Sequence, residues 1–336
     1  MTRASIWLLA LLLALLLPAA GCTPEPDADS AADLSTPKRP TIALVMKDLG
    51  NEFFQTMADG AREHQAAHAD EYDLIVDGIP NEQDLNRQVA IVSQLTAKGV
   101  DAIVLAPADS RGLVPAVEKA AAAGIVVVNI DNPLDADRLA ESRLAVPFVG
   151  PDNRAGARVV GEHLAEQLPP GSKVAILEGI PTAMNAVDRR AGFEDAMQAA
   201  GMEVVDVQTA EWDTVKAGQI ATAMLSAHPD LAAILASNDS MALGALSAVK
   251  SKGRDAGTVG QGRVLVVGFD NIEAATAAVK DGRLLATADQ HADELAVFGI
   301  EAALAQLAGE PVADRQTPVD LITAESLAAV ASTGGE

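Results

Sequence analysis

The sequence predicts an α/β fold of two doubly wound parallel-sheet lobes, and three observations support it. From residue 40 onward, short runs of β-branched and aliphatic residues alternate with longer stretches of helical periodicity. The short runs are apolar along their whole length, as in parallel strands that helices cover on both faces. The alternation comes as two series of similar length, and right-handed crossovers wind each series into its own sheet.

The segment before the first strand has the order of an export signal over residues 1–21. Arg3 precedes an apolar run from Ile6 to Leu17, and small residues lead to Cys22, the only cysteine of the chain. The run is shorter than the roughly 20 residues of a membrane-spanning helix. The pattern resembles the lipobox of bacterial lipoproteins, which implies acylation of Cys22. An ordinary secretory signal is the alternative, and both interpretations place the folded part outside the cytoplasm.

Residues 22–39 are predicted to form a flexible linker. They are rich in Pro, Asp, Ser and Ala and have no apolar periodicity, so they cannot bury enough surface to fold. With a lipid on Cys22, this linker would tether the protein to a membrane.

Composition narrows the class of partner and the source of stability. The formal net charge is −23, which argues against binding to nucleic acid. No cysteine follows Cys22, so core burial must stabilise the folded part without disulfides. About 300 residues are enough for one large unit or two lobes.

The first series supplies four strands and three helices. The strands are expected at Thr41–Met46, Tyr72–Asp77, Ala102–Ala106 and Ile125–Ile130. The helices between them are expected near 52–68, 82–98 and 110–123.

The second series supplies five strands and five helices. The strands are expected at Lys173–Leu177, Glu203–Val207, Ala232–Ala236, Val264–Phe269 and Leu284–Ala288. The helices are expected near 153–168, 186–200, 214–227, 239–252 and 271–281.

Polar and aromatic side chains gather just beyond the strand ends, where open α/β sheets bind ligands. The first series offers Lys47, Asn51, Phe53, Phe54, Asp131 and Asn132, and the second Arg189, Trp212, Asn238, Asp270 and Gln290. Such side chains supply hydrogen-bond donors and acceptors for hydroxyl groups, and flat rings pack on the C–H face of a sugar. The sequence therefore predicts a pocket for a sugar or polyol.

Some of these residues also have a structural interpretation as helix caps. Asp131, Asp270 and Asn238 each follow a predicted strand, where such side chains cap the next helix.

The others can pack or pair without touching a ligand. Phe53 and Phe54 can pack a first helical turn onto the sheet, and Arg189 can be a surface charge like its neighbour Arg190. Lys47 is equally consistent with a ligand contact and with an ion pair to Asp131 or Asp270.

In their order and spacing, these residues resemble the ribose/galactose-type periplasmic sugar-binding proteins of ABC importers, from residue 40 to about 325. The resemblance is carried by Gly50-Asn51-Glu52-Phe53-Phe54, Asp59-Gly60-Ala61, Arg189 with Gly192-Phe193, Asn238-Asp239-Ser240-Met241-Ala242-Leu243-Gly244, Val267-Gly268-Phe269-Asp270 and Thr287-Ala288-Asp289-Gln290. Two positions depart from the ribose-specific members, which have a small hydroxyl residue in place of Lys47 and an arginine in place of Asn132.

The resemblance implies that the pocket lies between the lobes. The first lobe would present Asn51, Phe53, Phe54 and Asp131, and the second lobe or hinge Arg189, Trp212, Asn238, Asp270 and Gln290. It also implies three crossings, near Gly150–Asp152, Asp289–His291 and Thr317–Asp320. Lobe 1 would be 40–150 plus 291–318, and lobe 2 would be 151–290 plus 319–336. The lobes would close on the ligand, with Phe53 and Trp212 as opposing rings.

The expected function is capture of a sugar or polyol and its delivery to the membrane permease of an ABC importer. The alternative is a ligand sensor that signals to a chemoreceptor or a histidine kinase. No catalytic constellation points to an enzyme, and no cofactor is expected. His64 and His68 have a spacing that can hold zinc, but no third ligand is evident nearby, so no metal site is expected. We expect a monomer.

Overall fold

The computed structural model describes residues 39–256 and 263–333. The predicted signal, the lipidation site Cys22 and the linker up to residue 38 lie outside the described residues. Residues from Arg39 onward belong to one compact unit. Within the described part of the chain, no helix combines the length and the apolar character needed to cross a bilayer.

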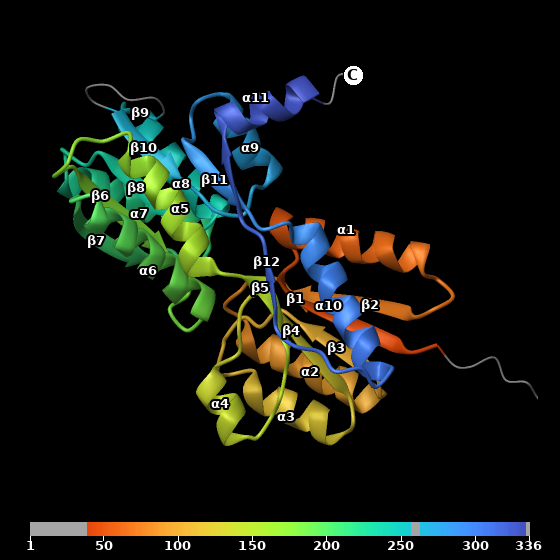
Figure 1. The fold of residues 1–336 in the computed structure, drawn as a ribbon. Helices are drawn as coiled ribbons and strands as arrows, with labels where there is room; N and C mark the ends of the chain where they lie inside the picture. Colours follow the sequence, from red (N-terminus) through yellow and green to blue (C-terminus); the bar gives the residue numbers. More distant parts are fainter. Residues whose placement is uncertain (1–38, 257–262, 334–336) are drawn as a thin grey trace, which may run out of the picture. The chain divides into compact units, whose positions relative to one another are not determined.

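Two separate sheets organise this unit (Figure 1). The first has the strand order β12-β5-β4-β3-β1-β2, and all of its pairs are parallel. Its strands are β1 (Thr41–Asp48), β2 (Asp73–Ile79), β3 (Ala102–Leu105), β4 (Val126–Ile130), β5 (Phe148–Pro151) and β12 (Arg315–Thr317).

The second sheet has the order β13-β11-β10-β8-β6-β7, and β9 pairs with β10 at its margin. Its strands are β6 (Lys173–Glu178), β7 (Glu203–Thr209), β8 (Ala233–Ala236), β9 (Asp255–Ala256), β10 (Arg263–Val267), β11 (Ala286–Asp289) and β13 (Asp320–Thr323). Only the β11–β13 pair is antiparallel among the described strands.

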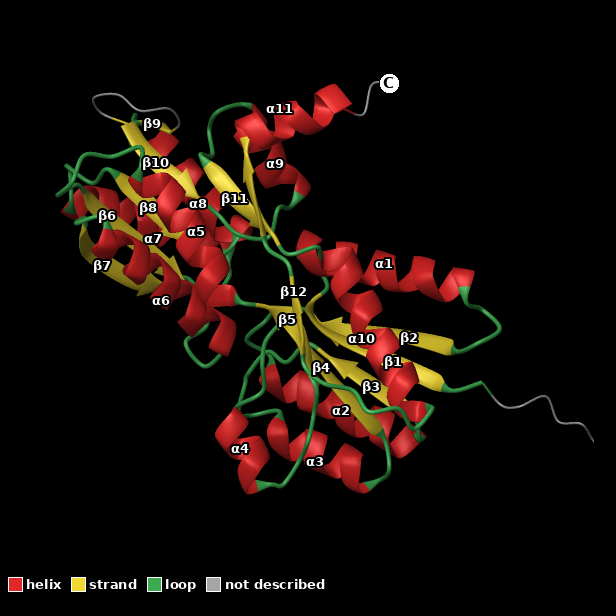
Figure 2. Ribbon diagram, viewed as in Figure 1, coloured by secondary structure: helices red, strands yellow, loops and turns green. Residues whose placement is uncertain are grey.

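Helices cover both sheets (Figure 2). We define lobe 1 as the first sheet with α1 (Glu52–Ala67), α2 (Leu85–Lys98), α3 (Val114–Ala122), α4 (Ala136–Glu141) and α10 (Ala292–Leu307). Lobe 2 is the second sheet with α5 (Asn153–Ala165), α6 (Met184–Ala199), α7 (Thr214–Ala227), α8 (Asp239–Ser251), α9 (Glu273–Lys280) and α11 (Ala324–Thr333).

Alternate residues of the central strands enter two different cores. In β1, Ile42 and Leu44 pack with α1 and α10, whereas Ala43 and Val45 pack with α2 and α3. A strand buried on both faces has no polar side, which explains the continuous apolar runs in the sequence. The predicted doubly wound, two-lobed α/β fold is confirmed.

Each predicted strand and helix corresponds to an observed one, but several elements were not predicted. These are β5, α4, β9, α10, β12, β13 and α11. The largest is α10, which packs between α1 and the first sheet. A Cβ on its Gly299 would lie 2.7 Å from both Val104 and Ile130, so glycine lets this helix approach the sheet closely.

The chain passes between the sheets three times, after β5, after β11 and between β12 and β13. The three passages are neighbours, because β12 pairs with β5 and β13 pairs with β11 (Figure 1). At the second passage His291 has a positive φ of 55°, and its Nε2 lies 2.9 Å from Asp320 Oδ2 of the third passage. This arrangement turns the carboxyl ends of both sheets toward a shared pocket.

Candidate functional site: a pocket between the two lobes

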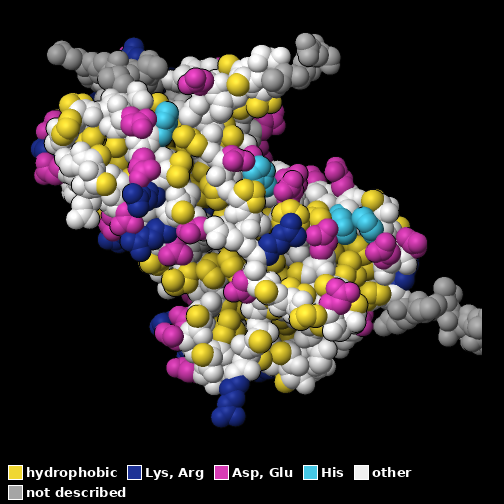
Figure 3. Space-filling view, in the orientation of Figure 1, with side chains coloured by type: hydrophobic (Ala, Val, Ile, Leu, Met, Phe, Trp, Pro, Cys, Tyr) yellow, Lys and Arg dark blue, Asp and Glu magenta, His cyan; other side chains and the backbone are white. Residues whose placement is uncertain are grey.

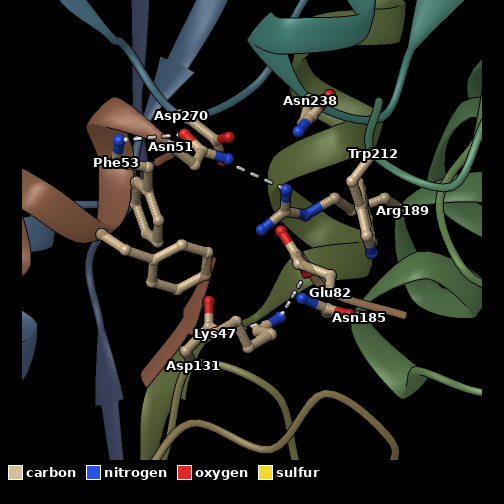
Figure 4. Close-up of a pocket in the computed structure, with 11 residues that line it drawn as sticks. Lys47, Asn51, Phe53, Glu82, Asp131, Asn185, Arg189, Trp212, Asn238 and Asp270 are labelled. Atoms are coloured by element: carbon tan, nitrogen blue, oxygen red, sulfur yellow. Dashed lines mark hydrogen bonds and ion pairs between the residues drawn. The ribbon is translucent and has the colours of Figure 1, made fainter. Parts of the chain in front are cut away.

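A pocket with about 230 Å³ of empty space lies between the lobes (Figure 4). Lobe 1 lines it with Lys47, Asn51, Phe53, Phe54, Glu82 and Asp131, and lobe 2 with Asn185, Arg189, Trp212, Asn238 and Asp270. Most of these residues stand at or just beyond the carboxyl end of a strand. The walls combine aromatic rings with charged and amide groups, as small-molecule pockets do.

Lobe 1 contributes a buried cluster of charges. The Nζ of Lys47, near the end of β1, lies 2.9 Å from Asp131 Oδ2 and 3.4 Å from Glu82 Oε2. Burial lowers the pKa of Lys47, but the two carboxylates outweigh it, so the pKa of this ammonium is raised. Burial raises the pKa of Glu82, and the charge of Lys47 opposes that rise. Lys47 thus pairs with Asp131 rather than Asp270, and it also lines the pocket.

Aromatic rings face the pocket from both lobes. Phe53 and Phe54 stand in the first turn of α1 with ring centroids 5.1 Å apart and an edge-to-face geometry. Asn51 begins that helix, because its Oδ1 accepts a hydrogen bond of 3.0 Å from the Phe53 amide. From lobe 2, Trp212 lies in the loop between β7 and α7, where its φ is +67°. Figure 4 shows Phe53 and Trp212 on opposite sides of the pocket.

Arg189 is the centre of the wall of lobe 2. It lies in the second turn of α6 and is 2 % exposed, so it is not a surface charge. Its Nη1 donates to Asp270 Oδ1 at 3.2 Å, and its Nη2 donates to Gln290 Oε1 at 2.9 Å. Its Nε and Nη1 also donate to Asn153 Oδ1 and the Ser237 carbonyl, at 2.8 and 2.9 Å. The protein therefore holds the guanidinium in a fixed orientation.

Asp270 is fixed from two sides in the same wall. Besides the bond from Arg189, it accepts a hydrogen bond of 2.7 Å from Gln290 Nε2. Burial raises the pKa of Asp270 well above its usual value, and the positive charge of Arg189 opposes that rise.

Of the three residues that could be helix caps, Asp131, Asp270 and Asn238, only Asn238 is one. Asn238 Oδ1 accepts a hydrogen bond of 2.9 Å from the Met241 amide and so caps α8 while lining the pocket. Asp270 is not a cap, because α9 begins after Ile272 with no side-chain cap. Asp131 is not one either, because Asp135 caps α4.

Nine of the eleven predicted site residues line the pocket, and Asn132 and Gln290 do not. Asn132 is fully buried beside it, donating to the Pro107 carbonyl at 2.8 Å and accepting from the Asn185 amide at 3.1 Å. Asn132 therefore joins the two lobes. Gln290 lies behind Asp270 and supports it.

Two lining residues, Glu82 and Asn185, were not predicted. Glu82 follows β2 by three residues, so the strand-end rule could have found it, but we expected a helix to begin there. Asn185 is four residues before Arg189 on α6, a spacing that puts both on one face of the helix. Among the described residues, Asn185 Oδ1 and Trp212 Nε1 are buried polar atoms of this pocket without a hydrogen-bond partner.

Direct contacts join the lobes around the pocket. Gln83 Nε2 donates to Glu211 Oε2 at 2.6 Å, and the Met184 amide donates to Ser110 Oγ at 3.0 Å. These contacts hold the two walls together at its edge.

His64 and His68 contact each other and Tyr72 rather than further candidate metal ligands among the described residues. Their rings stack 4.2 Å apart, and His64 Nδ1 lies 2.8 Å from the Tyr72 hydroxyl. Over residues 39–256 and 263–333, no three or more His, Cys, Asp or Glu side chains are grouped so as to hold a metal ion.

Residues 42–311 match the family described as the periplasmic binding protein domain, and the chain belongs to this family of solute-binding proteins. It is 55% identical over 300 residues to the D-ribose/D-allose-binding protein of Pseudomonas aeruginosa, covering 88% of this chain and 92% of that one. It is 36% identical over 283 residues to the ribose import binding protein of Escherichia coli, covering 84% and 89% of the two chains.

Comparison with solved structures likewise finds solute-binding proteins. An ABC transporter solute-binding protein from Burkholderia multivorans is 54% identical, with a TM-score of 0.81 over 85% of this chain and 99% of that one. A periplasmic solute-binding protein from Actinobacillus succinogenes with bound D-allose is 35% identical, with a TM-score of 0.81 over 87% and 100% of the chains. The family resemblance inferred from the sequence is confirmed, and the family places the folded part outside the cytoplasm.

Proposed function

We propose that this protein captures a monosaccharide of the D-ribose or D-allose type between its lobes and delivers it to the permease of an ABC importer. The observation that carries the proposal is the pocket, in which rings from both lobes flank buried, hydrogen-bonding side chains. The ligand class follows the names of the two relatives that bind or import ribose or allose. Among the relatives reported above, the Escherichia coli protein is named for import and the two solved structures for ABC transport, and none names a sensory role, so we do not propose the sensory alternative.

The binding residues in this proposal are the nine predicted residues that line the pocket, together with Glu82 and Asn185. Each hydrogen bond to a charged side chain contributes roughly 1.5–3 kcal/mol. Four or five of them, less the cost of immobilising the sugar, correspond to about −8 kcal/mol, a micromolar dissociation constant.

The lobes in this proposal are residues 40–150 plus 291–318 and residues 151–290 plus 319–336. One boundary lies between β12, which joins the first sheet, and β13, which joins the second. The other two boundaries are the passages after β5 and after β11. A cleft joined by three neighbouring passages allows hinge closure around a ligand.

We also propose that the mature protein is a monomer anchored to a membrane through lipidated Cys22 and that it does not turn over its ligand. The anchor rests on the sequence pattern of residues 1–22. Mass spectrometry of the mature protein tests it. The expected result is an acylated N-terminal Cys22 that is absent in Cys22→Ala, and an unmodified Cys22 would contradict it.

Isothermal titration tests the ligand class. D-allose, D-ribose and a panel of other neutral monosaccharides and polyols are titrated into the protein, and the bound sugar is recovered and analysed by mass spectrometry. We expect micromolar or tighter binding of at least one pentose or hexose, recovered unchanged. No binding across the panel would contradict the proposal, and recovery of a product would contradict the absence of turnover.

A further inference from the structure

One end of the pocket holds more negative than positive charge. Glu82 and Asp131 both face the single ammonium of Lys47, and all three side chains are no more than 7 % exposed. Among the described residues, Lys47 is the only cation within ion-pairing distance of either carboxylate. A buried charge without full compensation is costly, so further hydrogen-bond donors at this end would be stabilising.

Lobe 2 brings a further acceptor to the same end. Figure 4 shows Asn185 beside Lys47 and Glu82. Its Oδ1 is buried and has no hydrogen-bond partner in the part of the chain that the structure describes. A ligand that offers hydroxyl donors here would satisfy Asn185 and both carboxylates together.

At the other end of the pocket, the protein itself already uses most of the hydrogen-bonding capacity of the cation, Arg189. Arg189 uses its Nε, Nη1 and Nη2 on four acceptors of the protein, one of them the carboxylate of Asp270. A guanidinium has five N–H donors, so the protein takes most of them. Each cation of the pocket is therefore matched by at least one carboxylate.

We infer that Glu82 determines specificity: with Asp131 and Asn185 it forms a subsite at the Lys47 end that binds neighbouring hydroxyl groups of a neutral sugar and excludes sugar phosphates and sugar acids. The inference rests on the proposed function. An ionised carboxylate only accepts hydrogen bonds, whereas a hydroxyl group can donate one. The negative charge of a phosphate beside Glu82 would instead be repelled by the carboxylate.

Titration of wild-type protein, Glu82→Gln and a control variant tests the inference. The neutral ligands are D-allose, D-ribose and the monodeoxy derivatives of D-allose, and the anionic ones are D-ribose 5-phosphate and D-glucuronate. The control is Glu141→Gln, which also removes one carboxylate but lies 65 % exposed on α4. Thermal melting shows whether each variant is folded.

The wild type should bind its neutral sugar at least about tenfold more tightly than either anion, the factor that 1.4 kcal/mol gives. Glu82→Gln should weaken the neutral sugar about ten- to a hundredfold, since a hydrogen bond to a charged group is lost. At least one monodeoxy derivative should bind poorly to the wild type and lose much less further affinity in Glu82→Gln, because its missing hydroxyl is the one that Glu82 binds. Glu141→Gln should bind every ligand as the wild type does.

Three results would overturn the role of Glu82 and leave sugar binding intact. The first is unchanged affinity for the neutral sugar in Glu82→Gln. The second is that each monodeoxy derivative loses the same factor of affinity relative to D-allose in the wild type and in Glu82→Gln. The third is an anion that binds the wild type as tightly as the neutral sugar. No binding of any neutral sugar to the wild type would contradict the proposed function instead. If Glu82→Gln does not fold, Glu82→Asp replaces it, and the wild-type comparison of neutral with anionic sugars still decides the exclusion.

Discussion

The indole of Trp212 packs so closely on Gly179 that a Cβ at residue 179 would lie 2.1 Å from the ring. Gly179 directly follows β6, and Trp212 follows β7, its neighbour in the sheet. Two adjacent strand ends therefore fix the position of the ring that faces Phe53. The absence of a side chain at residue 179 is what leaves room for it.

We predict that Gly179→Ala displaces Trp212 and weakens sugar binding. No real Cβ contact is as short as 2.1 Å, so the rigid indole must move. Loss of a stacking ring should cost about tenfold or more in affinity, the equivalent of roughly 0.5–1.5 kcal/mol for the ring contact plus the hydrogen bonds that depend on it. Isothermal titration measures the loss.

Gly171→Ala is the control for this prediction. Gly171 has a φ of +80° and open space around its Cα, so alanine there strains only the backbone. It should lower the melting temperature without changing affinity. Wild-type affinity in Gly179→Ala would show that the position of Trp212 does not matter for binding.

Ligand binding should change the fluorescence of Trp212. Its ring lines the pocket and its Nε1 is buried without a hydrogen-bond partner among the described residues, so a sugar alters both its packing and its polarity. We expect a saturable change in emission with the dissociation constant that titration gives. The change should disappear in Trp212→Phe, which leaves only Trp7 of the signal region. A change that persists in this variant would contradict the assignment.

Periodicity in the sequence predicted the fold, but short strands and a mostly apolar helix were not predicted because they leave no clear periodic pattern. Strands such as β1 are buried on both faces, and β1 is apolar from Ile42 to Met46. By contrast, β12 and β13 have three and four residues and are set by pairing with strands far away in the chain. The helix α10 is apolar around most of its circumference because it packs between α1 and a sheet.

The site was predictable as far as side chains follow strand ends. The backbone at Asp131 has a φ of 65°, and this turn sends the next side chain, Asn132, away from the pocket and toward lobe 2. Gln290 stands at a strand end as well, but its hydrogen bonds hold it behind Asp270. Sequence position gives the edge of the sheet on which a residue lies, whereas the direction of its side chain depends on local backbone and partners.

Replacing Asp270 by Asn should weaken both binding and folding. Breaking a buried ion pair by removing one partner costs about 3–5 kcal/mol, and the remaining amide oxygen should reduce that cost for Asn. We therefore expect a lower melting temperature. We also expect an affinity loss of at least about tenfold, which corresponds to the loss of one hydrogen bond to a charged group. Thermal melting and isothermal titration measure the two effects.

Asp281→Asn is the matched control for Asp270→Asn. Asp281 pairs with Arg283 on the surface, where its side chain is 62 % exposed. Exposed pairs contribute about 0–1 kcal/mol, so this variant should melt and bind nearly as the wild type does. Equal effects of the two substitutions would contradict a special role for the buried pair.

The contact between Gln83 and Glu211 should slow the release of the sugar. It joins the lobes at the edge of the pocket through a hydrogen bond of 2.6 Å. In Gln83→Ala, Glu211 keeps its ion pair with Lys216, at 2.7 Å. The variant therefore removes only this one of the contacts between the lobes. Stopped-flow fluorescence should show a dissociation rate about two- to tenfold higher, the effect of roughly 0.5–1.5 kcal/mol. An unchanged dissociation rate would show that this contact does not hold the lobes closed.

The buried carboxyl of Asp239 should make stability depend on pH. It accepts hydrogen bonds from Thr287 Oγ1 at 2.7 Å and from the Ile272 amide at 3.0 Å, but burial dominates and raises its pKa to about 7. The unfolded chain releases this proton near its ordinary value of 3.8, whereas the folded protein keeps it up to about pH 7. The stabilisation that this group contributes to the folded protein is therefore fully present below pH 3.8, the pKa in the unfolded chain, and is lost as the pH rises through about 7.

The expected outcome is a difference between wild type and Asp239→Asn that changes with pH. The wild type should lose free energy of unfolding, of the order of a few kcal/mol, between about pH 4 and pH 7. The variant does not titrate at this position, so its stability relative to wild type should rise over the same range. His291 also has a raised pKa, since its bond to Asp320 and nearby carboxylates outweigh burial, and it lowers stability with rising pH in both proteins. Urea unfolding at pH 5, 6, 7 and 8 measures the difference, and parallel curves would show that Asp239 is already ionised in the folded protein.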